Sequence, residues 1–249
     1  MANTKAVSSK PSGALSNPFQ ASPYVKYRPL YYIAAFLIPA LLTFIAYALF
    51  GVYPFNGRSV LTLDLNGQYV YYFEAIRDAF WGGRSALYSW ERNLSGGFQG
   101  VIGYYLASPF TLIVVLLPKK FILESLMIMQ ICKVGAAGTS FCVYAQKSKK
   151  VPPLQSVIFS TMYALMAFVA IQLIDPMWID GPIFLPLIIL GVEYLIDDGR
   201  KINYIIPLAI MFIANFYIGF MVAIFVALYF VFYLFFGTDR KFRNSMDYA

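Results

Sequence analysis

The feature that most constrains the fold of this chain is a series of long apolar stretches between Tyr31 and Phe236. Several of them reach the roughly eighteen residues that a helix needs to cross the hydrocarbon core of a bilayer. Since 60% of the 249 residues are hydrophobic and only 12% are charged, a soluble fold would leave large apolar patches exposed to water. The sequence therefore predicts an all-α polytopic membrane protein.

About six transmembrane helices fit the apolar stretches. The 35-residue stretch Ile202–Phe236 would reach roughly 52 Å as one helix, which is too long for a bilayer core of about 30 Å. The polar break Asn215-Phe216-Tyr217 predicts a turn between two spans inside this stretch. The other expected spans are apolar segments between polar turns, namely Tyr31–Val52, Phe121–Ala145, Val157–Ile174 and Pro182–Ile196.

The distribution of Lys and Arg decides where the short apolar segment Tyr104–Leu117 lies. If this segment stays on one side of the membrane, 12 basic residues fall on the cytoplasmic side, whereas only six do so if it crosses. The positive-inside rule favours the first arrangement, although Lys119 and Lys120 then lie outside, next to a span. Because the basic residues form short clusters between apolar segments, the net charge of +7 does not indicate a surface for nucleic acid.

This topology divides the chain into three parts. Residues 1–30 are polar and rich in Ser, Pro and Asn, which predicts a disordered cytoplasmic tail. Residues 31–237 form the transmembrane module, with a long external loop at residues 53–120. Residues 238–249 return to the cytoplasm, so both ends are expected there, and all the polar turns on the other side should converge on one external face.

The external loop carries a carboxylate close to two amides, in the order Asp64, Asn66 and Gln68, followed by Tyr69. Asp64 could accept a proton from a hydroxyl group or help to hold a divalent cation through oxygen ligands. The alternative is an ordinary loop residue or a helix cap. The chain has no histidine, which excludes His-based metal sites, Ser-His-Asp triads and imidazole bases.

An amphipathic run and an aromatic segment follow in the same loop. The run Gln68–Trp81 predicts an interfacial helix that ends at Gly82-Gly83. Beyond it, Trp90, Glu91 and Arg92 combine an aromatic ring with charges. Such a ring suits stacking on sugars and Arg92 suits a phosphate, while aromatic residues of the membrane interface and a solvated ion pair are the alternative.

The turn Asp175–Asp180 places two carboxylates and Trp178 between two expected spans. Carboxylates next to spans are costly to insert and indicate function, although a turn at the water boundary tolerates them. Lys133 lies twelve positions into its expected span, roughly 18 Å deep. A buried ammonium group there needs a carboxylate, a carbonyl or a lipid phosphate as its partner.

At these motifs the sequence resembles the YfhO family of bacterial membrane proteins, over about residues 30–237. The matching segments are Asp64 with Gln68-Tyr69, Tyr88-Ser89-Trp90, Tyr104–Phe110, Asp175–Asp180 followed by Phe184–Ile188, and Asn215-Phe216-Tyr217. The resemblance implies a GT-C-like fold, the architecture of membrane enzymes that use lipid-linked sugars. Members of the family are several times longer, so we expect this chain to be an N-terminal portion or a truncated reading frame whose activity on its own is in doubt.

The resemblance also implies a reaction and a location. The expected function is transfer of a sugar from a polyprenyl-phosphate carrier to an envelope glycopolymer such as lipoteichoic acid, at the outer face of the bacterial plasma membrane. Asp64 would be the base or ligate a divalent cation, and Asp175 and Asp180 would complete the catalytic set. The residues expected to contact substrate are Asn66, Gln68, Tyr69, Trp90, Glu91, Arg92, Lys133, Trp178, Asn215 and Tyr217. The alternatives are a transporter for lipid-linked sugars and a non-catalytic protein of envelope assembly.

Overall fold

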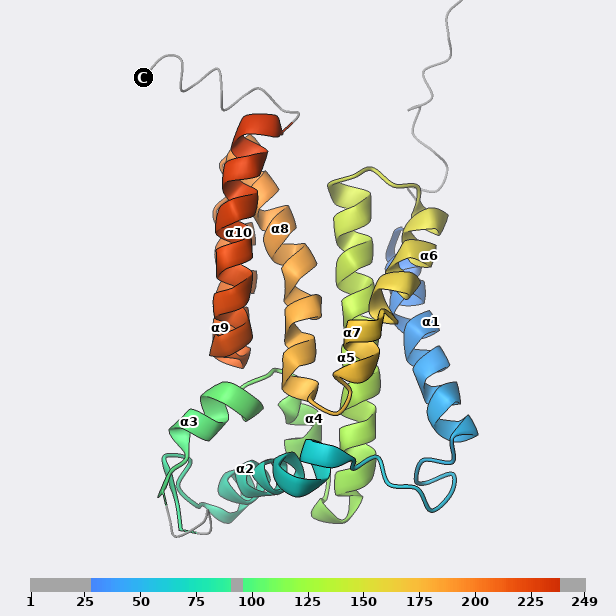
Figure 1. Ribbon diagram of the computed structural model, residues 1–249, viewed down its shortest axis with the longest axis vertical. Coiled ribbons are helices and arrows are strands. Elements are labelled where there is room, and N and C mark those ends of the chain that lie inside the picture. The colour runs from blue at the N-terminus through green and yellow to red at the C-terminus, as the bar shows by residue number, and fades with distance from the viewer. Residues whose placement is uncertain (1–27, 91–95, 238–249) are drawn as a thin grey trace, which may run out of the picture.

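The computed structural model describes residues 28–90 and 96–237, and this part of the chain is almost wholly helical (Figure 1). The expected N-terminal tail up to residue 27 and the expected cytoplasmic end at residues 238–249 lie outside the described residues. The helices that run along the long axis of the molecule form a bundle. They are α1 (Arg28–Leu49), α5 (Ile122–Lys147), α6 (Pro153–Ala164), α7 (Ala167–Ile171), α8 (Asp180–Asp198), α9 (Ile202–Ala214) and α10 (Phe216–Phe236).

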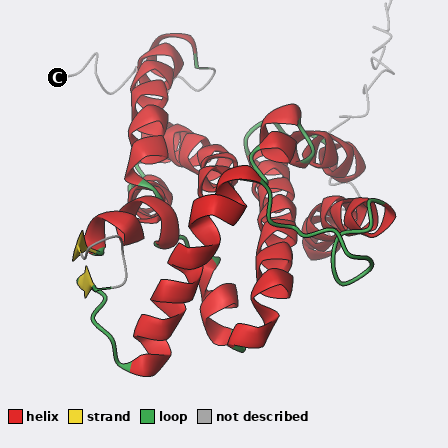
Figure 2. Cartoon of the chain, turned by 60° about the horizontal axis from the view of Figure 1, so that its bottom comes forward, coloured by secondary structure: helices red, strands yellow, loops and turns green. Residues whose placement is uncertain are grey.

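Short elements gather at one end of this bundle, which we call the loop end, and Figure 2 brings it forward. These elements are η2 (Leu65–Tyr69), α2 (Val70–Gly82), β1 (Tyr88–Ser89), β2 (Gly96–Gly97), α3 (Gln99–Val101), η3 (Ile102–Leu106), α4 (Thr111–Leu116), η4 (Lys119–Phe121) and η5 (Pro176–Ile179). Helix α2 lies across the bundle axis, the orientation expected of an interfacial helix (Figure 1). It ends where predicted, because Gly83 adopts a φ of 64° that favours glycine.

Four helices among the described residues are long and apolar enough to cross a bilayer, so the six expected spans are not all confirmed. Each of the four contains a mostly apolar stretch of 18 residues with few charges. They are Pro29–Leu49, Lys119–Lys147, Pro176–Asp198 and Phe216–Phe236. Helix α9 has only 13 residues. The expected span Val157–Ile174 is broken, because the backbone at Met166 is extended between α6 and α7.

The segment Tyr104–Leu117 does not form a span. It begins within η3 and ends just after the six-residue helix α4, with Ser108 and Pro109 between them. Neither helix is long enough to cross a bilayer, and both lie at the loop end (Figure 1). This agrees with the arrangement that the basic residues favoured.

The turn between α9 and α10 confirms the break predicted at Asn215. This residue has extended backbone angles, with φ −159° and ψ 105°, and its side-chain oxygen accepts a hydrogen bond from the backbone nitrogen of Ile218 at 2.9 Å. Such an N-cap satisfies a donor that the first turn of α10 would otherwise leave unpaired. One polar residue therefore divides the longest apolar stretch into two helices.

Small residues bring the bundle helices into close contact. A Cβ atom on Gly138 of α5 would lie 2.3 Å from the carbonyl oxygen of Ala35 in α1. A Cβ atom on Gly191 of α8 would lie 2.4 Å from the carbonyl oxygen of Asn203 in α9. Glycine at these two positions therefore allows the backbones to approach as closely as they do, which is a common way for membrane helices to associate.

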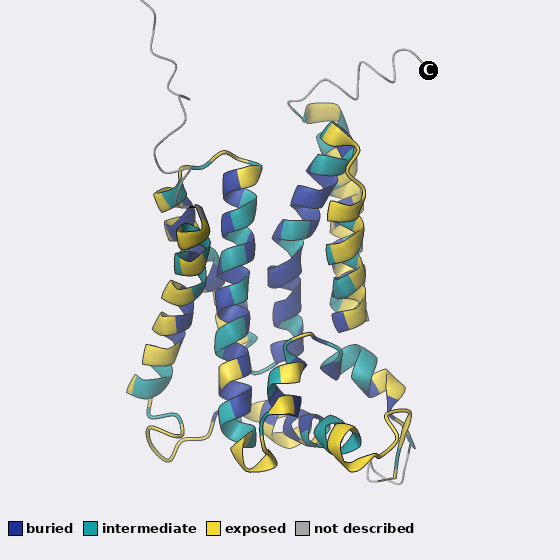
Figure 3. Ribbon diagram, turned by 180° about the vertical axis from the view of Figure 1, so that it is seen from behind, coloured by how far each residue is buried: buried dark blue, intermediate teal, exposed yellow. Residues whose placement is uncertain are grey.

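Two large buried clusters of apolar residues and a small one, around Ala35 and Cys142, hold the molecule together. One of the large clusters lies among α5, α8, α9 and α10 and includes Ile188 and Met211. The other belongs to the loop end, where Leu65 and Phe73 pack with Leu126 from the start of α5. The loop end is therefore a packed region with its own core. Figure 3 shows that the outward faces of the bundle helices are exposed, and many of these exposed residues are large and apolar, as contact with lipid requires.

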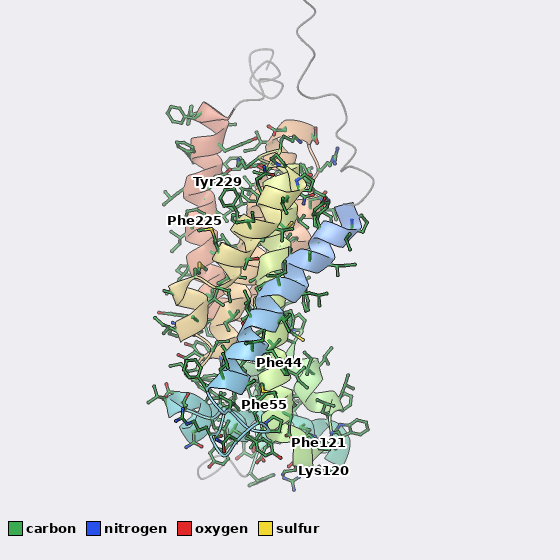
Figure 4. The ribbon with its side chains drawn as sticks, turned by 90° about the vertical axis from the view of Figure 1, so that its right-hand side faces the viewer. Phe44, Phe55, Lys120, Phe121, Phe225 and Tyr229 are labelled. Carbon is green, nitrogen blue, oxygen red and sulfur yellow. The ribbon has the colours of Figure 1, made fainter. Side chains whose placement is uncertain are left out.

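Contacts at the two ends fix the connecting segments. Near the loop end, the ring of Phe44 on α1 packs edge-on against Phe55 with a centroid distance of 5.2 Å (Figure 4). At the opposite end, Glu193 of α8 accepts hydrogen bonds from Lys149 at 2.8 Å and from the hydroxyl of Tyr229 on α10 at 2.7 Å. This second group joins the loop after α5 to the other half of the bundle.

Candidate functional site

Asp64 lies at the loop end, directly before helix η2, with its side chain exposed. The preceding residue, Leu63, has a φ of 46°, in the left-handed region that a residue with a branched side chain seldom adopts. Such strain persists only when the surrounding structure holds it, and it is often found at functional sites. The packing of Leu65, which is fully buried in the loop-end core, holds the chain immediately after Asp64.

The hydroxyl of Tyr69 connects two of the predicted catalytic carboxylates. It lies 3.4 Å from Oδ2 of Asp64, and the carboxylate of Asp175 lies near enough to raise its pKa. Burial raises the pKa of Tyr69 first of all, and the carboxylates of Asp175 and Asp64 raise it further. The phenol therefore stays protonated and donates to Asp64. The structure thus brings Asp64, Tyr69 and Asp175 together, although they come from η2 and from the turn before η5.

A hollow of about 820 Å³ opens beside Asp64. It is lined on one side by residues of η2 and α2 and carries three carboxylates, with Lys119 as the single basic residue among its described lining residues. Lys119 forms an ion pair of 3.1 Å with Asp78. The lining residues are Asp64, Gly67, Gln68, Tyr71, Tyr72, Glu74, Ala75, Asp78, Ser89, Phe98 and Lys119.

A second hollow, of about 290 Å³, adjoins the first and is aromatic. The two share Ala75, Ser89 and Phe98 in their walls. Tyr88 and Trp90 also line the smaller hollow, with their rings edge to face at a centroid distance of 5.1 Å. Trp90 is 81% exposed, so its face is open to a ligand.

Helix α2, which forms one wall of both hollows, is attached to α4 by two side chains. Nε of Arg77 donates to the carbonyl oxygen of Leu117 at 2.9 Å, and Nε1 of Trp81 donates to the carbonyl oxygen of Val115 at 2.7 Å. These carbonyls lie at the C-terminal end of α4, where helix carbonyls lack partners within the helix. The two side chains therefore cap α4 and fix α2 in place.

A chain of aromatic rings leads from the larger hollow to α10. Tyr72 lies 5.0 Å from Tyr105, which lies 4.5 Å from Tyr104, between ring centroids. Tyr104 in turn lies 6.0 Å from Tyr217 at the start of α10. The neighbouring Asn215 is fully buried, and its Nδ2 donates to the carbonyl oxygen of Tyr104 at 2.9 Å. Asn215 therefore positions η3, and Tyr217 belongs to this ring series rather than to the lining of either hollow.

Asp180 and Lys133 form a buried ion pair away from the two hollows. Nζ of Lys133 lies 2.9 Å from Oδ2 of Asp180 and 2.7 Å from the carbonyl oxygen of Pro176. Oδ1 of Asp180 accepts a hydrogen bond from Ser108 at 2.9 Å, and Nζ of Lys133 lies 5.6 Å from the ring centre of Phe110. The side chains are 0% and 1% exposed, so both groups have their partners inside the protein. The pair joins α5, α8 and the segment between η3 and α4.

The remaining predicted residues occupy varied positions. Gln68 lines the larger hollow and donates to the hydroxyl of Tyr72 at 2.9 Å. Asn66 is exposed and lines neither hollow. Trp178 is half-buried in η5 and packs against the loop-end core. Glu91 and Arg92 lie outside the described residues.

Three charged residues that line the larger hollow were not predicted as site residues from the sequence: Glu74, Asp78 and Lys119. Glu74 and Asp78 are four residues apart on α2, so they share one face of the helix. Their position away from the apolar stripe of the amphipathic run was the signal that could have identified them. Within residues 28–90 and 96–237, no three His, Cys, Asp or Glu side chains gather as a metal site, so the expected cation at Asp64 has no cluster of such ligands there.

Comparison with known proteins gives one match. The model of a family described as bacterial membrane protein YfhO matches residues 34–248. Neither a search of curated proteins nor a search of solved structures gave a match.

Proposed function

Because the chain belongs to the YfhO family of bacterial membrane proteins, we propose that it takes part in sugar transfer at the membrane surface. The donor would be a sugar on a polyprenyl-phosphate carrier, and the acceptor a hydroxyl of an envelope glycopolymer such as lipoteichoic acid. In this proposal the loop end faces the outside of the cell. The observation that carries it is the larger hollow, which places Asp64 next to the aromatic hollow of Trp90.

The reaction requires few groups. The acceptor oxygen attacks the anomeric carbon of the donor, the bond between that carbon and the phosphate oxygen breaks, and the carrier phosphate leaves with the electron pair. Asp64 takes the proton from the acceptor hydroxyl. A carboxylate suits this role because Asp64 is exposed beside the hollow. Although it is a weak base, the acceptor hydroxyl becomes acidic as its oxygen bonds to the anomeric carbon, and the carboxylate can then take the proton.

In this proposal the acceptor and the donor bind in different hollows. A glycan ring of the acceptor would stack on Trp90, and the donor sugar would lie in the larger hollow. Lys119, at its edge, would offset the charge of the carrier phosphate, since Lys133 is enclosed by Asp180 and Pro176. In this proposal Asp175 acts through Tyr69, whose pKa its carboxylate raises.

The test is the variant Asp64→Asn in the protein as its host makes it. Membranes would be given a polyprenyl-phosphate donor with a labelled sugar, and incorporation into envelope polymer would be measured. We expect a loss of at least about 100-fold, the usual range for removing a general base. The matched control is Asp198→Asn, because Asp198 lies at the opposite end of the bundle and pairs with Arg200.

Full incorporation by Asp64→Asn at normal protein levels would disprove the assigned role. Movement of labelled carrier across proteoliposomes without any transfer would instead favour a transporter. If neither activity occurs while polymer is still lost from cells that lack the protein, a non-catalytic role in envelope assembly is the better description.

A further inference from the structure

Two side chains of α5 form hydrogen bonds with the turn that carries Asp175, one before this residue and one after it. Nε2 of Gln130 donates to the carbonyl oxygen of Leu173 at 2.6 Å, and Nζ of Lys133 donates to the carbonyl oxygen of Pro176 at 2.7 Å. These two carbonyls flank Asp175 in the chain. Gln130 and Lys133 are three residues apart and therefore lie on the same face of α5.

Both donors are themselves fixed on their other side. Oε1 of Gln130 accepts a hydrogen bond from the hydroxyl of Tyr47 on α1 at 2.8 Å. Lys133 is paired with Asp180 at 2.9 Å. Gln130 and Lys133 are each 1% exposed. Because buried polar groups with all their partners in place resist rearrangement, the two side chains form a rigid support for the turn.

The turn is connected to the proposed reaction through one side chain. Met177, which follows the turn, lies in the same buried cluster as Tyr69, and the carboxylate of Asp175 lies near the hydroxyl of Tyr69. That hydroxyl lies 3.4 Å from Oδ2 of Asp64. A shift of the turn would therefore be transmitted to the carboxylate beside the larger hollow. Gln130 and Lys133 line neither hollow, so they would influence the reaction only through this connection.

We infer that Gln130 and Lys133 are positioning residues, which set the location of Asp175 and, through Tyr69, that of Asp64. This inference rests on the proposed function, for which Asp64 is the base. It assigns the α5 side chains no contact with substrate. The geometry of the support would matter for the rate of transfer more than for binding of the donor.

The test compares Gln130→Leu with Tyr47→Phe. The first removes the donor to Leu173, whereas the second removes the opposite hydrogen bond of Gln130 and leaves that donor in place. We expect Gln130→Leu to lower kcat by about 10- to 100-fold with a KM for the donor within about twofold, since a displacement of about 1 Å has effects of this size. Tyr47→Phe should retain kcat within about threefold.

A second measurement follows the turn without any activity. The chain has three tryptophans, so replacing Trp81 and Trp90 by Phe leaves Trp178, which lies in η5 directly after the turn. Quenching of its fluorescence by acrylamide should rise clearly in Gln130→Leu and much less in Tyr47→Phe, which loosens Gln130 but keeps its bond to Leu173. This measurement uses purified protein in micelles and needs no substrate.

The two measurements separate the possible failures. Increased quenching in Gln130→Leu with an unchanged kcat would overturn the inference, because the turn would have moved without any effect on the rate of transfer. Equal quenching in both variants would overturn it as well, since the support would not hold the turn. If wild-type protein transfers no sugar but quenching changes as expected, the proposed function fails and the support for the turn stands.

Discussion

The variants Lys133→Met and Asp180→Asn test the buried ion pair directly. Lys133→Met leaves the carboxylate of Asp180 inside the protein, where it still accepts a hydrogen bond from the hydroxyl of Ser108. Asp180→Asn leaves an ammonium group that is 1% exposed with neutral acceptors only, the carbonyl of Pro176 and the new amide. Each single variant therefore leaves one buried charge without its counter-charge.

The expected cost follows from this geometry. Removing one member of a buried pair costs about 3–5 kcal/mol, which shifts the unfolding equilibrium by about a thousandfold. The double variant contains neither charge, and the new Asn can still accept from Ser108. Its main loss is the donor to the carbonyl of Pro176, which costs about 1–3 kcal/mol. We therefore expect the double variant to be more stable than either single variant.

The assay is reversible unfolding in mixed micelles as the proportion of a denaturing detergent is raised, followed by circular dichroism. The free energy of unfolding is measured for the wild type, both single variants and the double variant. Purely additive losses, or single variants that each lose less than about 1 kcal/mol, would refute the reasoning, because the two groups would then not compensate each other inside the protein.

Three further predictions concern packing, capping and pH. Gly138→Leu should separate α1 from α5, because even a Cβ atom there would lie 2.3 Å from the carbonyl oxygen of Ala35. Chemical cross-linking between the two helices should fall, and the free energy of unfolding should drop by about 1–3 kcal/mol. Asn215→Ala removes the N-cap of α10 and should cost about 0.5–2 kcal/mol, measured by thermal unfolding in micelles. Partial burial lowers the pKa of Lys149, but its hydrogen bond and ion pair with Glu193 outweigh this, so its pKa is raised overall. The ion pair between Lys149 and Glu193 should therefore stabilise the protein fully below the usual lysine pKa of about 10.4. This stabilisation should be lost as the pH rises through the raised pKa that Lys149 has in the folded protein. Glu193→Gln should remove the corresponding fall in melting temperature at alkaline pH.

Local features of the sequence predicted the parts of the fold that depend on local physics. The all-α membrane fold is confirmed, as are the turn at Asn215 and the end of α2 at Gly82-Gly83. The two turns depend on a capping side chain and on a left-handed glycine, which act within a few residues. The membrane helices depend on apolar stretches that are continuous in the sequence. The break at Met166 had no such marker, because no Pro, Gly or charged residue interrupts the expected span there.

The candidate site depended on contacts between distant segments. The depth of Lys133 showed that it needed a partner, but its partner Asp180 is 47 positions further along the chain. Asp175 and Asp180, which lie in one turn, were likewise both expected to belong to the catalytic set. The structure gives them different surroundings, since Asp180 is enclosed whereas Asp175 is half-buried beside Tyr69. Tertiary packing alone makes that distinction.

The core of the loop end also imposes an order on biosynthesis. Leu65 and Phe73 leave the ribosome long before Leu126 and Met177, with which they share that core. Since chains emerge from the N-terminus at about 5–20 residues per second, residues 53–120 spend several seconds without the side chains that complete their packing. The larger hollow therefore takes its final form only after the turn at Asp175 has been delivered to the same side of the membrane. A pause or a wrong insertion in α5 would leave α2 exposed to proteases, even though its own sequence is intact.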